Sequence, residues 1–167
     1  MSAPVHAFEA ERAVMAQALR AALHPPADAP AFTPREVAAM MRLARELTDQ
    51  GKLEKADTLL TGVLATRPDD AGLLRALARI RQSQGRAEDA LTLLAMVDLL
   101  EPDELTNGLE LAMACLQAGR RTQGLDLLDI TRERCERLAP GSALHQRVLA
   151  LLELQRQADR PKEGCAR

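Results

Sequence analysis

The residue types that most often carry chemistry are few in this sequence and lie far apart. The three histidines stand in separate segments, and none has another histidine or a cysteine three or four residues away: His6, His24 and His145. The three cysteines show no C-x-x-C spacing: Cys115, Cys135 and Cys165. No glycine-rich phosphate loop and no nucleophile elbow is present. We therefore predict no catalytic residues, no metal site, no cofactor and no enzyme activity.

The cysteines are informative about packing and compartment. Cys115 falls on the inward-facing phase of its predicted helix and is expected to be a small core residue. Cys135 fits a core or a surface position, and Cys165 is expected to be an exposed thiol. An odd number of cysteines without a disulfide framework favours a reducing compartment.

What remains is a surface that suits peptide binding. Three similar segments, 34 residues apart, each place a set of side chains on one face of a predicted helix. The residues expected to line this groove are Ala38, Met41 and Arg45, then Arg75, Arg79 and Gln82, then Leu109, Met113 and Leu116, with Thr48 on the same face. An apolar floor flanked by guanidinium groups suits an extended peptide with aliphatic anchors and nearby carboxylates or backbone carbonyls.

Two interpretations of this face remain open. Arg75 and Arg79 are either groove residues or solvated charges, and the sequence favours neither. The apolar residues of the third segment can instead belong to the core. For Met41, Met113 and Leu116 the groove is favoured, because the opposite side of their helices already carries a Leu/Ala stripe.

The elements that position this face come from an internal repeat. The stretch from Val37 to Glu104 holds two copies of one 34-residue template, and a looser third copy follows. The matching positions are Leu43/Leu77, Ala44/Ala78, Gly51/Gly85, Ala56/Ala90, Leu60/Leu94, Val63/Val97 and Pro68/Pro102. This period and pattern are those of the tetratricopeptide repeat, a pair of antiparallel helices. One pair buries one face only and must stack on a neighbour.

The recurring residues predict how each pair is built. A Leu and an Ala, such as Leu43 and Ala44, are expected to face the partner helix. Small residues should let the two helices cross closely, namely Ala56, Ala90 and Gly124. Glycines should end the first helices, because they tolerate a positive φ: Gly51, Gly85 and Gly119.

We therefore predict an all-α fold of three tetratricopeptide repeats in a right-handed superhelix, with an N-terminal leader helix and a C-terminal capping helix. The predicted segments are a leader helix and Pro-rich linker at 1–30, repeats over 34–140 (approximately 37–70, 71–104 and 105–140), a capping helix at 141–159 and a flexible tail at 160–167. Thr33 and Glu36 are expected to form a capping box, and Ser142 to cap the last helix.

The amino-acid composition argues against some classes of binding partner. The net charge of −2, with arginines interspersed among acids, argues against binding to nucleic acid or to an anionic membrane surface. No stretch approaches membrane-spanning length, so we expect no stable membrane insertion and a cytoplasmic location. Phe8 and Phe32 are the only aromatic residues, which predicts an aliphatic core.

The arrangement resembles the tetratricopeptide chaperones of type III secretion systems, in particular those that hold translocator proteins before export. Their leader helix, three repeats and C-terminal helix correspond to nearly the whole chain. Most specific is the end of the first helix of the second copy, where the family has a small residue followed by Arg-Gln-x-x-Gly, matched here by Arg81, Gln82 and Gly85. The general repeat pattern has a Tyr where Arg81 stands. This sequence departs from the family in having almost no aromatic residues.

The resemblance implies a cytoplasmic chaperone whose groove binds an extended segment of a translocator, or of another exported subunit, and prevents its premature association. The alternative is a scaffold or assembly adaptor that joins folded partners. The resemblance also suggests a homodimer formed through an amphipathic leader stripe, the alternative being that this stripe folds back on the first repeat. The stripe comprises Val5, Phe8, Met15, Leu19 and Leu23.

Overall fold

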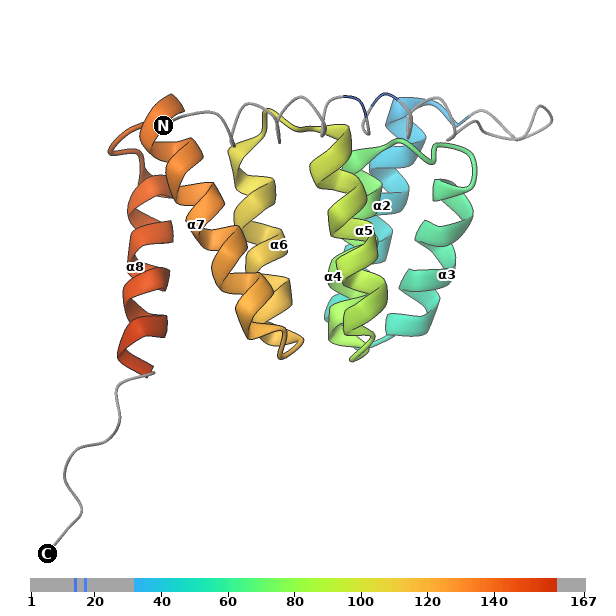
Figure 1. Cartoon of the computed structure of the whole chain (residues 1–167). Helices are drawn as coiled ribbons and strands as arrows, with labels where there is room; N and C mark the ends of the chain where they lie inside the picture. The colour runs from blue at the N-terminus through green and yellow to red at the C-terminus, as the bar shows by residue number, and fades with distance from the viewer. Residues whose placement is uncertain (1–13, 15–16, 18–31, 159–167) are drawn as a thin grey trace, which may run out of the picture. The chain divides into compact units, whose positions relative to one another are not determined.

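The structure is a computed structural model that describes residues 14, 17 and 32–158. Within these residues all regular secondary structure is α-helical, as predicted. The helices are α2 (Pro34–Asp49), α3 (Leu53–Leu64), α4 (Ala71–Ser83), α5 (Ala87–Leu100), α6 (Leu105–Gln117), α7 (Arg121–Leu138) and α8 (Ala143–Ala158) (Figure 1). Within each of the two units described below, successive helices are joined by short turns and run antiparallel.

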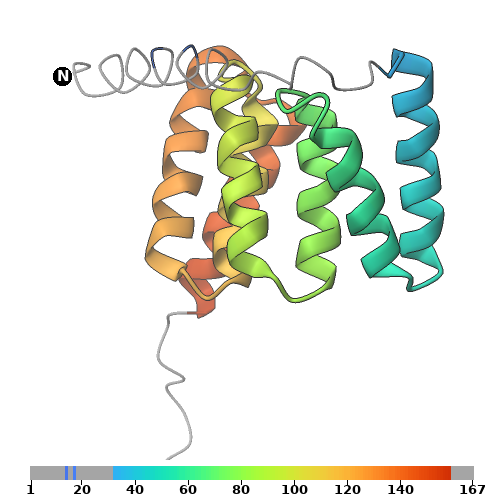
Figure 2. The same cartoon turned by 90° about the vertical axis from the view of Figure 1, so that its right-hand side faces the viewer.

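The chain divides into two compact units, and each is described by itself. The first unit comprises residues 1–107 and contains α2 to α5 with the first turn of α6. The second comprises residues 108–167 and contains the rest of α6 with α7 and α8. Within the first unit, α2 and α3 form one antiparallel pair and α4 and α5 the next (Figure 2). The division falls inside α6, and therefore inside the third predicted repeat.

Glycine ends the first helix of each pair. Gly51, Gly85 and Gly119 have φ values of 72°, 76° and 77°, a region in which a side chain would be strained. Each follows its helix within two residues and directs the chain back toward the next one. The predicted turn chemistry is confirmed at all three positions.

Side chains cap the helices as the sequence indicated. The Glu36 amide donates to Thr33 Oγ1 at 3.3 Å, and the Thr33 amide donates to Glu36 Oε2 at 2.8 Å. The Thr33 amide and the Thr33 hydroxyl both donate to the Glu36 carboxylate, and these two bonds hold the pKa of the Glu36 carboxyl below its ordinary value. Asp70 Oδ1 accepts from the Leu73 amide at 3.1 Å and caps α4.

The core of the first unit is aliphatic. Ala56 and Ala90 are fully buried, and their place at the helix crossings stays a prediction. Leu77 is 1% exposed, whereas its repeat equivalent Leu43 is 47% exposed. The prediction that Leu43 faces a partner helix was wrong for the described residues. Leu77 has the preceding helix pair beside it, but no helix preceding α2 is described that could cover Leu43.

The second unit is built around a cluster formed by three helices. Its buried members are Leu109 and Ala112 of α6, Leu128 of α7, and Val148 and Leu152 of α8. Helix α8 therefore covers the apolar faces of α6 and α7, as a terminal helix of a repeat array must. Its N-terminus is capped by Ser142, whose Oγ accepts from the His145 amide at 3.2 Å.

Several predictions fall outside the described residues. These include the leader stripe of Val5, Phe8, Met15, Leu19 and Leu23, so self-association through the leader stays a prediction. Among the residues that the structure describes, no helix is both long and apolar enough to span a bilayer.

Candidate peptide-binding site

A pocket of about 210 Å³ opens between α2 and α4 in the first unit. Ten described residues line it, namely Met41, Arg42, Ala44, Arg45, Thr48, Leu60, Ala76, Arg79, Ile80 and Ser83. The first helices of two successive pairs form its walls, and Leu60 of α3 contributes from the second helix of the first pair.

The floor of the pocket is apolar and fixed by the core. Ala44, Leu60 and Ile80 are 2%, 0% and 3% exposed, so their positions are set by packing on neighbouring helices. The hydroxyls of Thr48 and Ser83 bond carbonyl oxygens of their own helices, at 2.8 Å and 3.0 Å. The pocket therefore suits an aliphatic side chain of a bound segment.

The rim of the pocket is cationic, whereas its floor is apolar. Arg42 and Arg45 of α2 and Arg79 of α4 are exposed, and no carboxylate is among the lining residues that the structure describes. Guanidinium groups can bond carboxylates or peptide carbonyls of a segment laid across the mouth of the pocket.

The structure brings together three of the predicted groove residues, namely Met41, Arg45 and Arg79, with Thr48 beside them. Ala38 is exposed on α2 and Gln82 is half-buried on α4, and neither lines the pocket.

Arg75 has a structural role instead. Its Nη2 donates to Asn107 Oδ1 at 2.5 Å and forms an ion pair with the Glu101 carboxylate. The Asn107 Nδ2 in turn donates to the Glu101 carbonyl oxygen at 2.9 Å, and Asn107 is only 2% exposed. Arg75 thus ties α4 to the turn between α5 and α6, which favours neither of the roles weighed from the sequence.

The third predicted group lies in the second unit. Leu109 is 3% exposed and belongs to the core cluster, which corrects its placement on an open face. In that cluster Leu109 lies with Leu128 of α7 and with Val148 and Leu152 of α8. Met113 and Leu116 pack half-buried against the same cluster, and Met113 Sδ lies 4.0 Å from Arg147 Nη2. Their contact with a peptide stays a prediction.

Sequence reasoning missed six lining residues: Arg42, Ala44, Leu60, Ala76, Ile80 and Ser83. Spacing could have found Ala76 and Ser83, which lie three residues before and four after Arg79 on α4. The spacing of residues along the sequence does not indicate that Leu60 lines the pocket. Leu60 lies on α3, and it reaches the pocket only because α3 packs against both α2 and α4.

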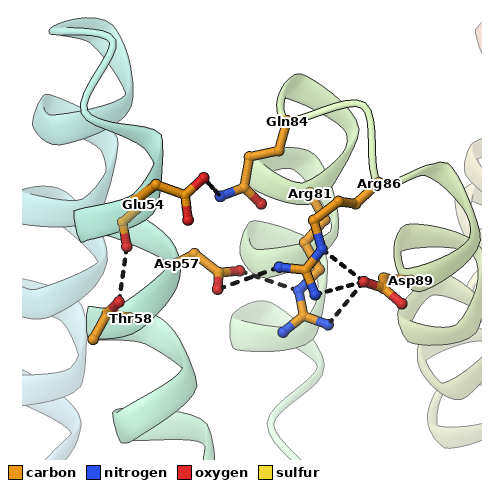
Figure 3. Close-up of polar contacts among 7 residues, drawn as sticks. All are labelled: Glu54, Asp57, Thr58, Arg81, Gln84, Arg86 and Asp89. Carbon is orange, nitrogen blue, oxygen red and sulfur yellow. Dashed lines mark hydrogen bonds and ion pairs between the residues drawn. The ribbon is translucent and has the colours of Figure 1, made fainter.

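Arg81 on α4 is the centre of an ion-pair network that joins three helices (Figure 3). Its Nε donates to Asp57 Oδ1 of α3 at 3.1 Å, and its Nη1 lies 3.9 Å from Asp89 Oδ2 of α5. Arg86 contacts the same two residues, at 3.8 Å from Asp57 Oδ2 and 2.6 Å from Asp89 Oδ2. The side chains of Arg81 and Asp57 are only 18% and 15% exposed, so salt screens this pair less than a surface pair.

The network is adjacent to the pocket along two helices. Asp57 lies one helical turn before Leu60 on α3, and Arg81 directly follows Ile80 on α4. By holding α3 against α4, the pair of Arg81 and Asp57 helps to fix the spacing of two pocket walls. This gives a physical role to the arginine that stands where the general repeat pattern has a Tyr.

We expect Arg81→Gln to lower the free energy of unfolding by about 1.5–3 kcal/mol, the contribution of a hydrogen bond between charged groups. The loss arises because Asp57 keeps its half-buried carboxylate without its nearest cation. Urea unfolding followed by circular dichroism measures the change.

Arg132→Gln is the matched control. Arg132 pairs with Asp129 and Glu136 of its own helix, at 3.3 Å and 2.7 Å, and the bond to Glu136 raises the pKa of its guanidinium. Such pairs within one helix contribute only about 0.3–0.5 kcal/mol. Equal losses for the two variants would contradict the role of Arg81 as a tie between helices.

The cysteines of the described residues are packing residues. Cys115 is 1% exposed, as predicted, and Cys135 is fully buried. Burial raises the pKa of the Cys135 thiol, which keeps it protonated and unreactive near neutral pH. Across residues 32–158 no group of three or more His, Cys, Asp or Glu side chains is arranged to hold a metal ion.

Comparison with known proteins agrees with the observed arrangement of helix pairs. Residues 47–108 match the family model of the tetratricopeptide repeat. No curated protein matches the sequence. The chain has the tetratricopeptide-repeat fold over these residues, with the antiparallel helix pairs that its 34-residue period requires.

Among solved structures, its fold is that of translocator chaperones of type III secretion. The Yersinia enterocolitica chaperone SycD has a TM-score of 0.64 at 18% identity, over 78% of this chain and 90% of that one. PcrH from Pseudomonas aeruginosa has a TM-score of 0.64 at 22% identity, over 77% of this chain and 98% of that one. SycD in complex with a peptide of the translocator YopD has a TM-score of 0.62 at 19% identity, over 75% and 96%. At these identities the likeness concerns the fold.

Proposed function

We propose that this chain is a cytoplasmic type III secretion chaperone that binds an extended segment of a translocator, or of another exported subunit. The observation that carries the proposal is the pocket between α2 and α4, with its buried apolar floor and arginine rim. Binding hides apolar client surface before export and involves no chemical step.

The similar structures support this choice of client. SycD is described in complex with a peptide of the translocator YopD, and PcrH with the chaperone binding region of PopD. In this chain an apolar client side chain would enter between Ala44 and Ile80 and reach Leu60. Burying one such side chain stabilises the complex by about 1.5–3 kcal/mol, so several contacts along the segment are needed for tight binding.

Co-expression with the translocators of the same secretion system tests the proposal. We expect a translocator to co-purify with this chain in soluble form and to be insoluble when expressed alone. Co-purification of a folded export-apparatus subunit, with no effect on any translocator, would contradict the chaperone function and favour the adaptor.

A further inference from the structure

The charge of the pocket rim narrows the kind of segment that this chain binds. Among the ten lining residues are three arginines, Arg42, Arg45 and Arg79, and no acidic residue. They border a floor whose buried members are all aliphatic. A bound side chain therefore meets apolar surface at its tip, while the backbone and neighbouring side chains meet guanidinium groups.

We infer that the pocket selects segments in which an aliphatic anchor is flanked by aspartate or glutamate. The inference rests on the proposed function and adds a charge requirement to it. A carboxylate beside the anchor can form charge-assisted, bidentate bonds with guanidinium groups. A lysine at the same place would meet like charges and would be disfavoured.

The arginines elsewhere in the first unit show how this chain uses such pairs internally. Arg75 is paired with Glu101, and Arg81 with Asp57, each from a different helix or turn. Arg42 and Arg45 present the same side-chain type toward a space whose described lining residues include no carboxylate. Charge complementarity thus points to an acidic segment as the occupant.

Selection from a displayed library of random peptides tests the inference with the full chain. We expect enriched peptides to carry Leu, Ile, Val or Met with Asp or Glu next to it. Enrichment of aliphatic residues without neighbouring acids would overturn the charge requirement and leave the proposed function in place. A failure to enrich aliphatic residues at all would overturn both.

The enriched peptide then provides a sharper measurement. Its Asp→Asn version should bind about 2- to 5-fold more weakly for each arginine engaged, the range of an exposed ion pair. In the double variant Arg42→Gln and Arg45→Gln we expect this ratio to fall toward one, since Arg79 is then the only rim arginine among the described residues. Arg35→Gln, which removes an exposed charge of α2 outside the pocket, is the control and should leave the ratio unchanged. An unchanged ratio in the double variant would overturn the inference.

Discussion

Filling the pocket with a side chain should abolish most client binding. In Ala76→Leu the added atoms project into a space of about 210 Å³ that the anchor of a client would otherwise occupy. Losing the burial of one aliphatic anchor costs about 1.5–3 kcal/mol. Because 1.4 kcal/mol corresponds to a factor of ten, the affinity should fall about 10- to 100-fold. Isothermal titration with a client segment measures it.

The controls separate this effect from unfolding. Ala76 is half-exposed and borders an open space, so the variant should keep its helix content and its melting temperature. Ala39→Leu makes the same change at an exposed position of α2 that does not line the pocket, and should leave the affinity unaltered. Normal binding by a folded Ala76→Leu protein would place the client elsewhere.

Replacing a helical glycine with alanine should destabilise the protein at Gly124 and stabilise it at Gly62. A Cβ at Gly124 in α7 would lie 2.8 Å from Cγ and Cδ2 of Leu116 and 3.1 Å from the Ala112 carbonyl oxygen. Carbon atoms in contact prefer about 3.5–4.0 Å, so the Leu116 side chain or the two helices must shift to make room. We expect Gly124→Ala to cost on the order of 1–3 kcal/mol, despite its better helix propensity.

Gly62→Ala is the matched control, because an added Cβ there meets no atom within 4 Å. This position in α3 should gain about 0.5–1 kcal/mol from the reduced flexibility of the unfolded chain. Thermal unfolding gives both values, with about 2–4 °C expected for each kcal/mol. A rise in melting temperature for both variants would show that α6 and α7 do not cross closely at Gly124.

Local features were the most predictable from the sequence. Gly51, Gly85 and Gly119 adopt a positive φ, and Thr33 and Glu36 form their capping box, because these structures depend on a few neighbouring residues. The burial of Ala56 and Ala90 and the close contact at Gly124 were equally predictable, because these equivalent positions of the repeats all carry small residues.

Features that depend on distant partners were not predictable. Arg75 pairs with Glu101 and Asn107, which lie 26 and 32 residues further along, so its role could not be read from the face of its own helix. Leu109 is buried in a cluster that also contains Val148 and Leu152 of α8, and the repeat periodicity says nothing about contacts with that helix. The same holds for Leu60, which reaches the pocket only through the packing of three helices.

Site-specific photo-crosslinking tests most directly whether a client segment lies in the pocket between α2 and α4. A photoreactive residue in place of Ser83, at the exposed edge of the pocket, should crosslink to a co-expressed translocator. The same residue in place of Thr58, exposed on α3 outside the pocket, should not. Adding Ala76→Leu should remove the crosslink from position 83. Efficient crosslinking from position 58, or a crosslink from position 83 that survives the filled pocket, would contradict binding at this site.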